Sequence, residues 1–518
     1  MPPQRSFAQA LDMLPHPPSA HPLVRTLAAC ALALLTACAA GPESAPRNRG
    51  LTPATAAHAA AALDPRDTLV ENSVMLSFSG GGARAAAFTL GALQGLDTLP
   101  NGEGGTLLDQ VRFITSVSGG SMTAAYFGLH GKAGLPEFRR LALLGDSEGA
   151  LRTSLFNPRN IWRLLSGGLN DRSTLPTWLE RSVFKGATFA QMSQQGRPVV
   201  WINATNLRQR IAFPFHQRAF DALCSDLSSF PVSEAVAASM AVPVVFTPIV
   251  LEKHPERCQA PLPDWVDSYG LAFGDSMLAH SLLQTLHDFR DLGTGRYVKL
   301  VDGGLSDNFG LSSIQQSHLL MGTPHAPWSE RDAIRIRNLL FVVVDGGQQP
   351  SGNLNQDLDG PSGIDLAMAA IDAAIDTNVR LSYDSFVQMI RRWQDDTIRY
   401  RCKLPDDAQR RIRDRQPGWR CDDVQFTVTR LSFGDLAPAR AQALNAIPTR
   451  LKLPEQDIDA LIEAGREAMA HSLSVRYFAA RAQGVTDSFW RPALTEPAAT
   501  PASPSTVQAP TRNDNAAR

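Results

Sequence analysis

Three glycine-containing stretches carry residue types that can act on an ester. Gly80–Gly82 follow an apolar run and precede a helical pattern, where glycine lets backbone N–H groups turn toward an anion. Ser118 ends a second apolar run, and Gly119 and Gly120 supply the small residues that a strained nucleophilic turn needs. Asp302 ends a third run. A hydroxyl, a carboxylate and free amides are the groups required for attack on a carbonyl carbon.

The same stretches also have ordinary structural explanations. A glycine run between a strand and a helix is typical of a tight turn, and a small-x-Ser-x-Gly pattern recurs by chance. The glycine loop lacks the dinucleotide-binding pattern because Ala85 occupies the sixth position, and no phosphate-binding GxxxxGK[ST] loop occurs. Ser116 stands where a nucleophile turn usually has its first glycine.

Alternating strands and helices must position these groups. Strands are predicted at 73–79, 111–118, 197–207, 297–304, 339–347 and 424–433, an extended segment at 241–250, and helices at 83–96, 233–240, 364–393 and 455–480. This alternation predicts an α/β fold with a mostly parallel central sheet between helices. Reactive groups should then gather at the carboxyl ends of the strands.

The three motifs together resemble the patatin-like phospholipases. That family combines a GGGxR loop, a GxSxG nucleophile and a DG[AG] motif, which read here Gly80–Arg84, Ser116–Gly120 and Asp302–Gly304. The segments INATNL (202–207) and AVAASMAVPVVFTPI (235–249) also look like family segments. The resemblance is clear over 71–350 and looser over 351–482. It implies a three-layer α/β/α sandwich over 71–485, with an insertion around 251–296.

The resemblance also implies the role of each motif residue. Ser118 would be the nucleophile and Asp302 the general base, in a dyad without histidine, cofactor or metal. The oxyanion would be held by amides of Gly80, Gly81, Gly82 and Gly119, with Gly120, Gly303 and Gly304 as motif glycines. The substrate would be a phospholipid or another acyl-ester lipid, and the enzyme a phospholipase A or lysophospholipase.

Two charged residues near the motifs allow alternative roles. Arg84 either steadies the glycine loop or binds a lipid phosphate; otherwise it is a surface arginine at a helix start. Asp345 competes with Asp302, since it too precedes two glycines after an apolar strand. The residues around Asp302 fit the family pattern better, so Asp345 is interpreted as a turn or helix-cap residue.

Two other functions remain open from the sequence. A Ser-His-Asp esterase would draw its histidine from His318, His325 or His471, which follow both aspartates. His318 and His471 lie in helical patterns, where a structural histidine is usual. Alternatively, the fold is kept as a catalytically inactive envelope scaffold or lipid-binding protein, for which Ser116 is the one hint.

The N-terminal residues predict a secreted lipoprotein. Arg25 precedes an apolar stretch over 27–37, too short to span a bilayer comfortably, and Leu-Thr-Ala-Cys ends at Cys38. This resembles a bacterial lipobox, so we expect a signal peptide over 1–37, acylation of Cys38 and a flexible tether over 38–70. The alternative is an ordinary secretory signal. Ala39 favours the outer membrane over the inner one, and translation starts at Met1 or Met13.

Four further cysteines suit an oxidising compartment. Sequence neighbours suggest the pairs Cys224–Cys258 and Cys402–Cys421, although four cysteines permit three pairings and buried thiols are the alternative. No CxxC or HExxH occurs, which argues against a zinc site.

The overall composition argues against nucleic-acid binding. The formal net charge is −1 over 518 residues, and the sequence contains no stripe of Lys and Arg residues of the kind that binds nucleic acid.

The Pro/Ala/Thr-rich tail over 486–518 is predicted to be disordered. Residues 157–169 form either an amphipathic flap that touches lipid or an ordinary core-facing helix. The sequence gives no indication of oligomeric state.

Overall fold

A computed structural model describes residues 45–55, 70–152, 168–194, 196–259, 262, 266, 276–321, 325, 329–347 and 363–485. Its centre is an eight-stranded sheet in the order β10-β9-β2-β3-β4-β8-β7, with β5 pairing on β4. The strands are β2 (Asn72–Phe78), β3 (Val111–Val117), β4 (Val199–Asn206), β5 (Ile211–Phe215), β7 (Ile249–Glu252), β8 (Tyr297–Asp302), β9 (Asn338–Val344) and β10 (Gln425–Leu431).

The sheet is parallel over most of its width. β10, β9, β2, β3 and β4 run in one direction, whereas β8 and β5 are antiparallel to β4 and β7 is antiparallel to β8. Every residue of β2 and β9 is buried, as the continuous apolar runs of covered parallel strands predict.

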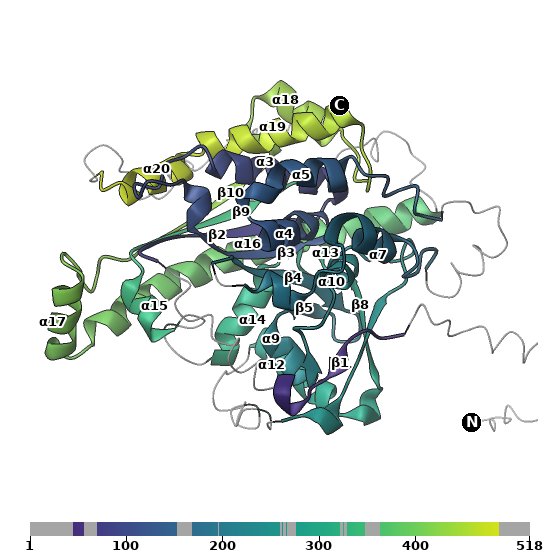
Figure 1. Cartoon of the computed structure of the whole chain (residues 1–518), viewed down its shortest axis with the longest axis horizontal. Helices are drawn as coiled ribbons and strands as arrows, with labels where there is room; N and C mark the ends of the chain where they lie inside the picture. The colour runs from purple at the N-terminus through teal and green to yellow at the C-terminus, as the bar shows by residue number, and fades with distance from the viewer. Residues whose placement is uncertain are drawn as a thin grey trace, which may run out of the picture.

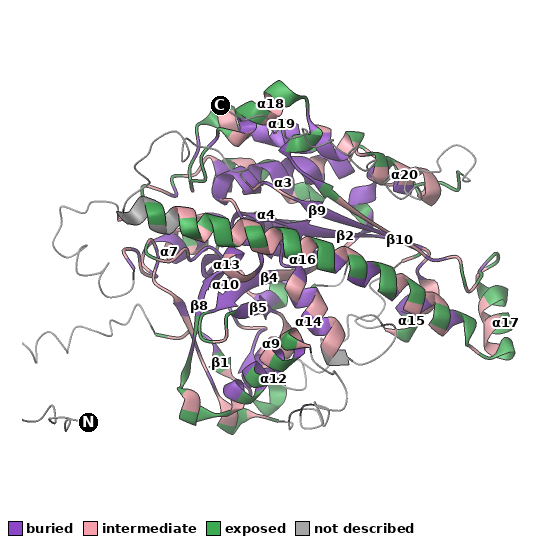
Figure 2. Cartoon of the chain, turned by 180° about the vertical axis from the view of Figure 1, so that it is seen from behind, coloured by how far each residue is buried: buried purple, intermediate pink, exposed green. Residues whose placement is uncertain are grey.

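Helices cover both faces of the sheet (Figures 1 and 2). One face packs on α3 (Gly82–Leu96) and α4 (Ser118–His130), with α19 (Glu455–His471) lying on α3. The other face packs on α14 (Leu311–Met321) and the long α16 (Gly363–Cys402), whose outer side is exposed. The predicted α/β/α sandwich with a mostly parallel sheet is therefore confirmed.

Shorter helices lie between these main elements. They are α5 (Leu135–Phe138), α7 (Leu175–Trp178), α8 (Phe189–Met192), α9 (Gln217–Ala222), α10 (Val232–Ser239), α12 (Met277–Arg290), α13 (Gly304–Asp307), α15 (Glu330–Arg335), α17 (Asp406–Arg415), α18 (Pro438–Asn445) and α20 (Leu473–Ala482). The predicted last helix is divided at Ser472 into α19 and α20. No described helix is long and apolar enough to cross a membrane.

The N-terminal segment differs from the predicted tether. β1 (Arg49–Gly50) pairs antiparallel with β6 (Ser225–Asp226). Asn48 is buried; its side chain donates to Ser225 Oγ at 2.7 Å and accepts from the amide of Glu252 at 2.8 Å. Buried backbone and amide groups need such partners, so this part of 38–70 is docked on the domain. The prediction of a free tether is wrong for residues 45–51.

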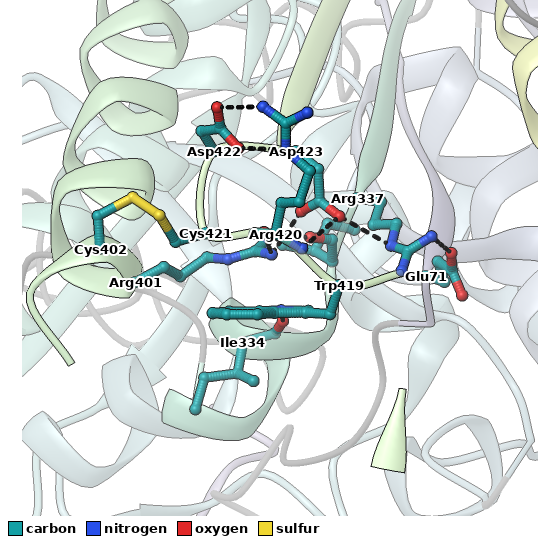
Figure 3. A network of polar contacts seen from close by, with 11 residues as sticks. Glu71, Ile334, Arg337, Arg401, Cys402, Trp419, Arg420, Cys421, Asp422 and Asp423 are labelled. Atoms are coloured by element: carbon teal, nitrogen blue, oxygen red, sulfur yellow. Dashed lines mark hydrogen bonds and ion pairs between the residues drawn. A yellow bond between two sulfur atoms is a disulfide. The ribbon is translucent and has the colours of Figure 1, made fainter. Parts of the chain in front are cut away.

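A polar network fastens the start of β9 to the end of α16 (Figure 3). The guanidinium of the buried Arg401 lies 4.7 Å from the centre of the Trp419 ring and donates to Asp423 at 2.5 Å. Asp423 also pairs with Arg337 at 3.1 Å, and Arg337 reaches Glu71 at 2.8 Å. A buried guanidinium is tolerated only with such partners, so this network orders the edge of the sheet.

Two disulfides join the cysteines as their sequence neighbours suggest. Cys224 is bonded to Cys258 beside β6, and Cys402 is bonded to Cys421 across the α17 hairpin. The signal peptide, Cys38, the whole tail over 486–518 and nearly all of the flap region 157–169 lie outside the described residues.

Candidate active site

Ser118 lies at the sharp junction between β3 and α4. Its φ of 48° is in the left-handed region, which non-glycine residues rarely adopt, and it is buried. A Cβ on Gly119 would lie 2.0 Å from the carbonyl oxygen of Gly82, and one on Gly120 would lie 2.6 Å from that of Ser79. Both glycines are therefore required for the junction to pack against the end of β2.

Ser116 fits this junction without a glycine. Its hydroxyl donates to the carbonyl oxygen of Trp201 on β4 at 3.0 Å, and its own carbonyl oxygen accepts from the Asn203 amide at 3.0 Å. The departure from the usual motif therefore leaves no unsatisfied hydroxyl in the sheet.

Asp302 meets Ser118 across one strand. The Ser118 hydroxyl donates to Asp302 Oδ2 at 2.9 Å, and Oδ1 of the same carboxylate accepts from the amide of Gly304 at 2.8 Å. The carbonyl oxygen of Asp302 also accepts from Thr205 at 2.8 Å. These contacts fix the carboxylate in position while leaving one oxygen on the serine.

Strand register explains how the two residues meet. β8 is antiparallel to β4, and Asp302 is paired with Ala204, while Val117 is paired with Asn203 on the other side of β4. Asp302 therefore reaches the level of Ser118 from the opposite direction. The sequence predicted that the reactive groups gather at the carboxyl ends of parallel strands, and the antiparallel direction of β8 differs from that expectation.

Burial changes the proton affinity of Asp302. Loss of solvent raises its pKa to about 6, and the Gly304 amide and the Ser118 hydroxyl oppose that rise. A carboxylate with this pKa is ionised at neutral pH, yet it is a better proton acceptor than an exposed aspartate. The site therefore contains a hydroxyl hydrogen-bonded to a base of raised basicity.

Three amides near Ser118 have no hydrogen-bond partner within the described part of the chain: those of Gly81, Gly82 and Gly119. Gly81 and Gly82 have φ values of 137° and 59°, which glycine adopts without strain. Free amides at the starts of two helices can stabilise negative charge on an oxygen. They are suited to hold an oxyanion beside the serine.

Gly80 does not fit the predicted set of donors. Its amide donates to both the side-chain and backbone oxygens of Asn308, at 3.1 and 3.2 Å. The prediction of Gly80 as an oxyanion donor is therefore wrong in this structure. Gly80 instead ties the glycine loop to the segment that follows Asp302.

Arg84 is not a surface residue, and its guanidinium is bonded to backbone carbonyl oxygens. It is buried and donates to the carbonyl oxygens of Gly346 at 2.9 Å and Ile447 at 2.8 Å, so it supports the loop after β9. Burial lowers its pKa to about 10 and Asp345 opposes that change. Asp345 itself accepts from the Gly347 amide at 2.9 Å, as a turn residue does.

Ser239 is a residue of the site that sequence reasoning did not find. Its hydroxyl accepts from the Ser118 amide at 2.8 Å and donates to the carbonyl oxygen of Asn203 at 2.5 Å. Its carbonyl oxygen accepts from the amide of Gly303 at 3.2 Å. One serine at the end of α10 therefore joins the nucleophile turn, β4 and the loop after Asp302.

Histidine takes no part in the bonds of Ser118 or Asp302. The ring of His318 lies 6.1 Å from that of Trp393, and the ring of His325 lies 4.9 Å from that of Tyr400. The third candidate, His471, lines a surface cavity next to α20. The Asp302 carboxylate instead accepts directly from the Ser118 hydroxyl, with none of these three imidazoles between them.

The family comparison agrees with this geometry. Residues 76–313 match the family model described as patatin-like phospholipase. This part of the chain belongs to the patatin-like phospholipase family. The patatin-like region contains the end of β2 and all of β3, β4 and β8, and with them both Ser118 and Asp302. Family membership implies an ester hydrolase that acts on lipids.

Similarity to solved structures is low. Human GIVD cytosolic phospholipase A2 aligns with 11% identity and a TM-score of 0.40, over 84% of this chain and 68% of that chain. The same protein in complex with methyl gamma-linolenyl fluorophosphonate gives 13% identity and 0.36, over 84% and 65%. VipD from Legionella pneumophila gives 10% and 0.28, over 79% and 67%. No curated protein matches the chain.

No group of three or more His, Cys, Asp or Glu residues among the described residues could hold a metal ion.

Proposed function

We propose that this patatin-like domain hydrolyses acyl ester bonds of phospholipids or related lipids, with Ser118 as nucleophile and Asp302 as general base. The observation that carries the proposal is the 2.9 Å hydrogen bond from the serine hydroxyl to a buried carboxylate. The free amides of Gly81, Gly82 and Gly119 support it, because they flank the same serine.

In the first half of the reaction, Ser118 Oγ attacks the ester carbonyl carbon while its proton passes to Asp302 Oδ2. The carbonyl oxygen becomes negatively charged and is held by the three amides, each worth about 3 kcal/mol to the transition state. The bond from carbon to the leaving oxygen then breaks. Asp302 returns the proton to that oxygen, which leaves as the alcohol.

The second half releases the acyl chain. A water molecule attacks the acyl carbon as Asp302 accepts one of its protons. The bond to Ser118 Oγ breaks, the proton returns to the serine, and a carboxylic acid leaves. A base with a pKa of about 6 suits both halves, because it can accept and return a proton near neutral pH.

We also propose that the enzyme acts in the bacterial envelope, held in the outer membrane by acyl groups on Cys38. Support comes from the lipobox-like Leu-Thr-Ala-Cys sequence and from the pairing of four cysteines in disulfides, which persist in oxidising compartments. An anchored enzyme would meet its lipid substrate in its own bilayer.

Release of fatty acid from defined phospholipids tests the catalytic proposal. Wild type is compared with Ser118→Ala and Asp302→Asn, and Asp345→Asn serves as a matched control at the end of β9. We expect release by wild type and by the control, with a loss of at least about a hundredfold in the two dyad variants. An inactive wild type would favour a scaffold or lipid-binding role, and equal activity of all four proteins would refute the dyad.

A further inference from the structure

The docked N-terminal segment fixes the place at which the chain leaves the domain. Asn48 is buried against β6 and β7, and the Arg47 guanidinium pairs with the buried Glu234 at 3.4 Å. Arg172 pairs with the same carboxylate at 2.9 Å and also donates to the carbonyl oxygen of Ala45. The first described residue is thus held beside the start of α10.

The chain between this point and the proposed lipid anchor is short. Ala45 follows Cys38 by seven residues. A fully extended chain of that length reaches about 25 Å. An acylated Cys38 would therefore keep the surface around Ala45 close to the membrane, and the free rotation of a longer tether is excluded.

An apolar loop lies next to this surface. Residues 242–245 (Val-Pro-Val-Val), which we call the apolar loop, follow α10 and carry no charge. The Leu169 amide donates to the carbonyl oxygen of Val244 at 3.2 Å, and the Asn170 amide donates to that of Val245 at 3.0 Å. The short stretch 169–172 therefore holds both the apolar loop and Ala45.

Val244 has two unusual properties for a valine. It has a φ of 74°, a strained value for a β-branched residue, and its side chain is 43% exposed. An exposed apolar side chain at a strained position gains little from packing within the chain. Strained backbone of this kind persists only where the surrounding structure holds it in place, and it clusters at active sites and at segments that contact ligands.

The apolar loop is also adjacent to the dyad. The carbonyl oxygen of Ala241, which precedes the loop, accepts from the amide of Asp302 at 2.9 Å. Ser239, two residues earlier, bonds the amide of Ser118. In Figure 1, α7, α10 and α13 lie close to one another, and β1 lies below them. The stretch 169–172 and the end of α10 therefore connect the chain exit, the apolar loop and the dyad through a short series of direct contacts.

We propose that the apolar loop rests on the bilayer that carries the Cys38 anchor, so that the dyad faces that bilayer's own lipids. This inference rests on the proposed acylation of Cys38. Val242 and Val245 pack partly against the core, so Val244 is the exposed side chain of the loop, and an exposed apolar side chain can enter the boundary between headgroups and acyl chains. The seven-residue connection and the docked segment 45–51 together hold the domain in this orientation.

Fluorescence of a label at position 244 tests the orientation without any need for turnover. The full chain carries Ser118→Ala, which leaves the vesicle lipids intact, together with Val244→Cys labelled with an environment-sensitive dye. The introduced thiol is free because the native cysteines are lost with the leader, acylated or disulfide-bonded. The matched control is Val485→Cys. Val485 is also an exposed valine, at 50%, and it follows α20. This helix lies beside the start of β9, because its Arg481 contacts the first residue of that strand.

Both labelled proteins are inserted through their own anchors into vesicles of phosphatidylethanolamine and phosphatidylglycerol that contain a headgroup-level spin-labelled quencher. We expect about threefold stronger quenching at position 244 than at position 485. Equal quenching, or stronger quenching at 485, would overturn the proposal. The proposal would also be overturned if the dye at position 244 were shielded from water only after an envelope protein is added. The apolar loop would then bind a protein partner instead of the bilayer.

Release of the docked segment supplies a second test. Arg47→Ala together with Asn48→Ala removes the ion pair with Glu234 and the buried hydrogen bonds of Asn48, which weakens the docking of residues 45–51, and thermal unfolding shows whether the domain still folds. We expect the difference in quenching between positions 244 and 485 to disappear in a folded variant. A difference that persists would overturn the role of the docked segment.

Failure of this inference is distinguishable from failure of the proposed function. Mass spectrometry of the N-terminal peptide reports acylation, and a Cys38 without acyl groups would overturn the orientation along with the anchor. An acylated protein that is quenched at 244 and yet does not hydrolyse phospholipid, when carrying its native Ser118, supports the orientation and refutes the catalytic proposal.

Discussion

Asp302→Asn should make the domain more stable while it removes activity. The buried carboxylate of Asp302 is costly to ionise, which is why its pKa lies at about 6 instead of 3.8. That difference of about two pKa units corresponds to about 3 kcal/mol of unfavourable free energy in the folded state at neutral pH. The neutral asparagine avoids this cost and can still accept from the Gly304 amide, so we expect a gain of about 2 kcal/mol.

The pH dependence gives this prediction its sign. An acid with a raised pKa in the folded state binds more protons when folded than when unfolded between about pH 4 and pH 6. Wild type therefore loses stability relative to the asparagine variant as the pH rises through that window. The gap should be near zero below pH 4 and complete above about pH 7.

Activity of the wild type should rise with pH, whereas its stability relative to the asparagine variant falls. Only ionised Asp302 can accept the serine proton, so kcat/KM should fall about tenfold between pH 7 and pH 5. Urea unfolding of both proteins from pH 4 to pH 8 measures the stability gap, and Asp414→Asn on the exposed α17 is the control. A stability gap independent of pH, or an Asp302→Asn protein less stable than wild type at pH 8, would refute the reasoning.

Three further substitutions test other parts of the site and fold. Gly119→Ala should abolish activity and lower the thermal midpoint, because its Cβ would clash with the glycine loop at 2.0 Å; a fully active variant would contradict that packing. Ser239→Ala should lower kcat about tenfold with KM nearly unchanged, since the Ser118 amide loses its acceptor, and restoration by Ser239→Thr would support a positioning role. Replacing Cys402 and Cys421 by serine should cost about 3 kcal/mol of stability by urea unfolding without loss of activity at low temperature, and an unchanged midpoint would show that the bond contributes nothing.

Much of the fold can be predicted from the sequence, because the apolar runs and the glycines that mark its strands and helices are local features. The apolar runs at 73–79 and 111–118 coincide within a residue or two with β2 and β3, and the glycines after them mark where each strand ends. The helix over 83–96 is likewise α3 within one residue. Burial on both faces demands such uninterrupted apolar runs.

Features that depend on distant contacts were harder to predict. The antiparallel direction of β8 is set by pairing with β4, and no residue near 297–302 specifies it. The loss of the Gly80 amide to Asn308 and the burial of Arg84 arise from segments more than 220 residues away. The docking of residues 45–51 was missed because an Ala/Pro-rich composition resembles that of a flexible linker.

The measurement that tests the dyad most directly is the mass of the intact protein after reaction with a fluorophosphonate, followed by peptide mapping. We expect one adduct on Ser118 in wild type, a much slower reaction in Asp302→Asn, and none in Ser118→Ala. An adduct on any other residue, or one that forms at the same rate without the Asp302 carboxylate, would contradict the assignment of Ser118 and Asp302 as the reacting pair.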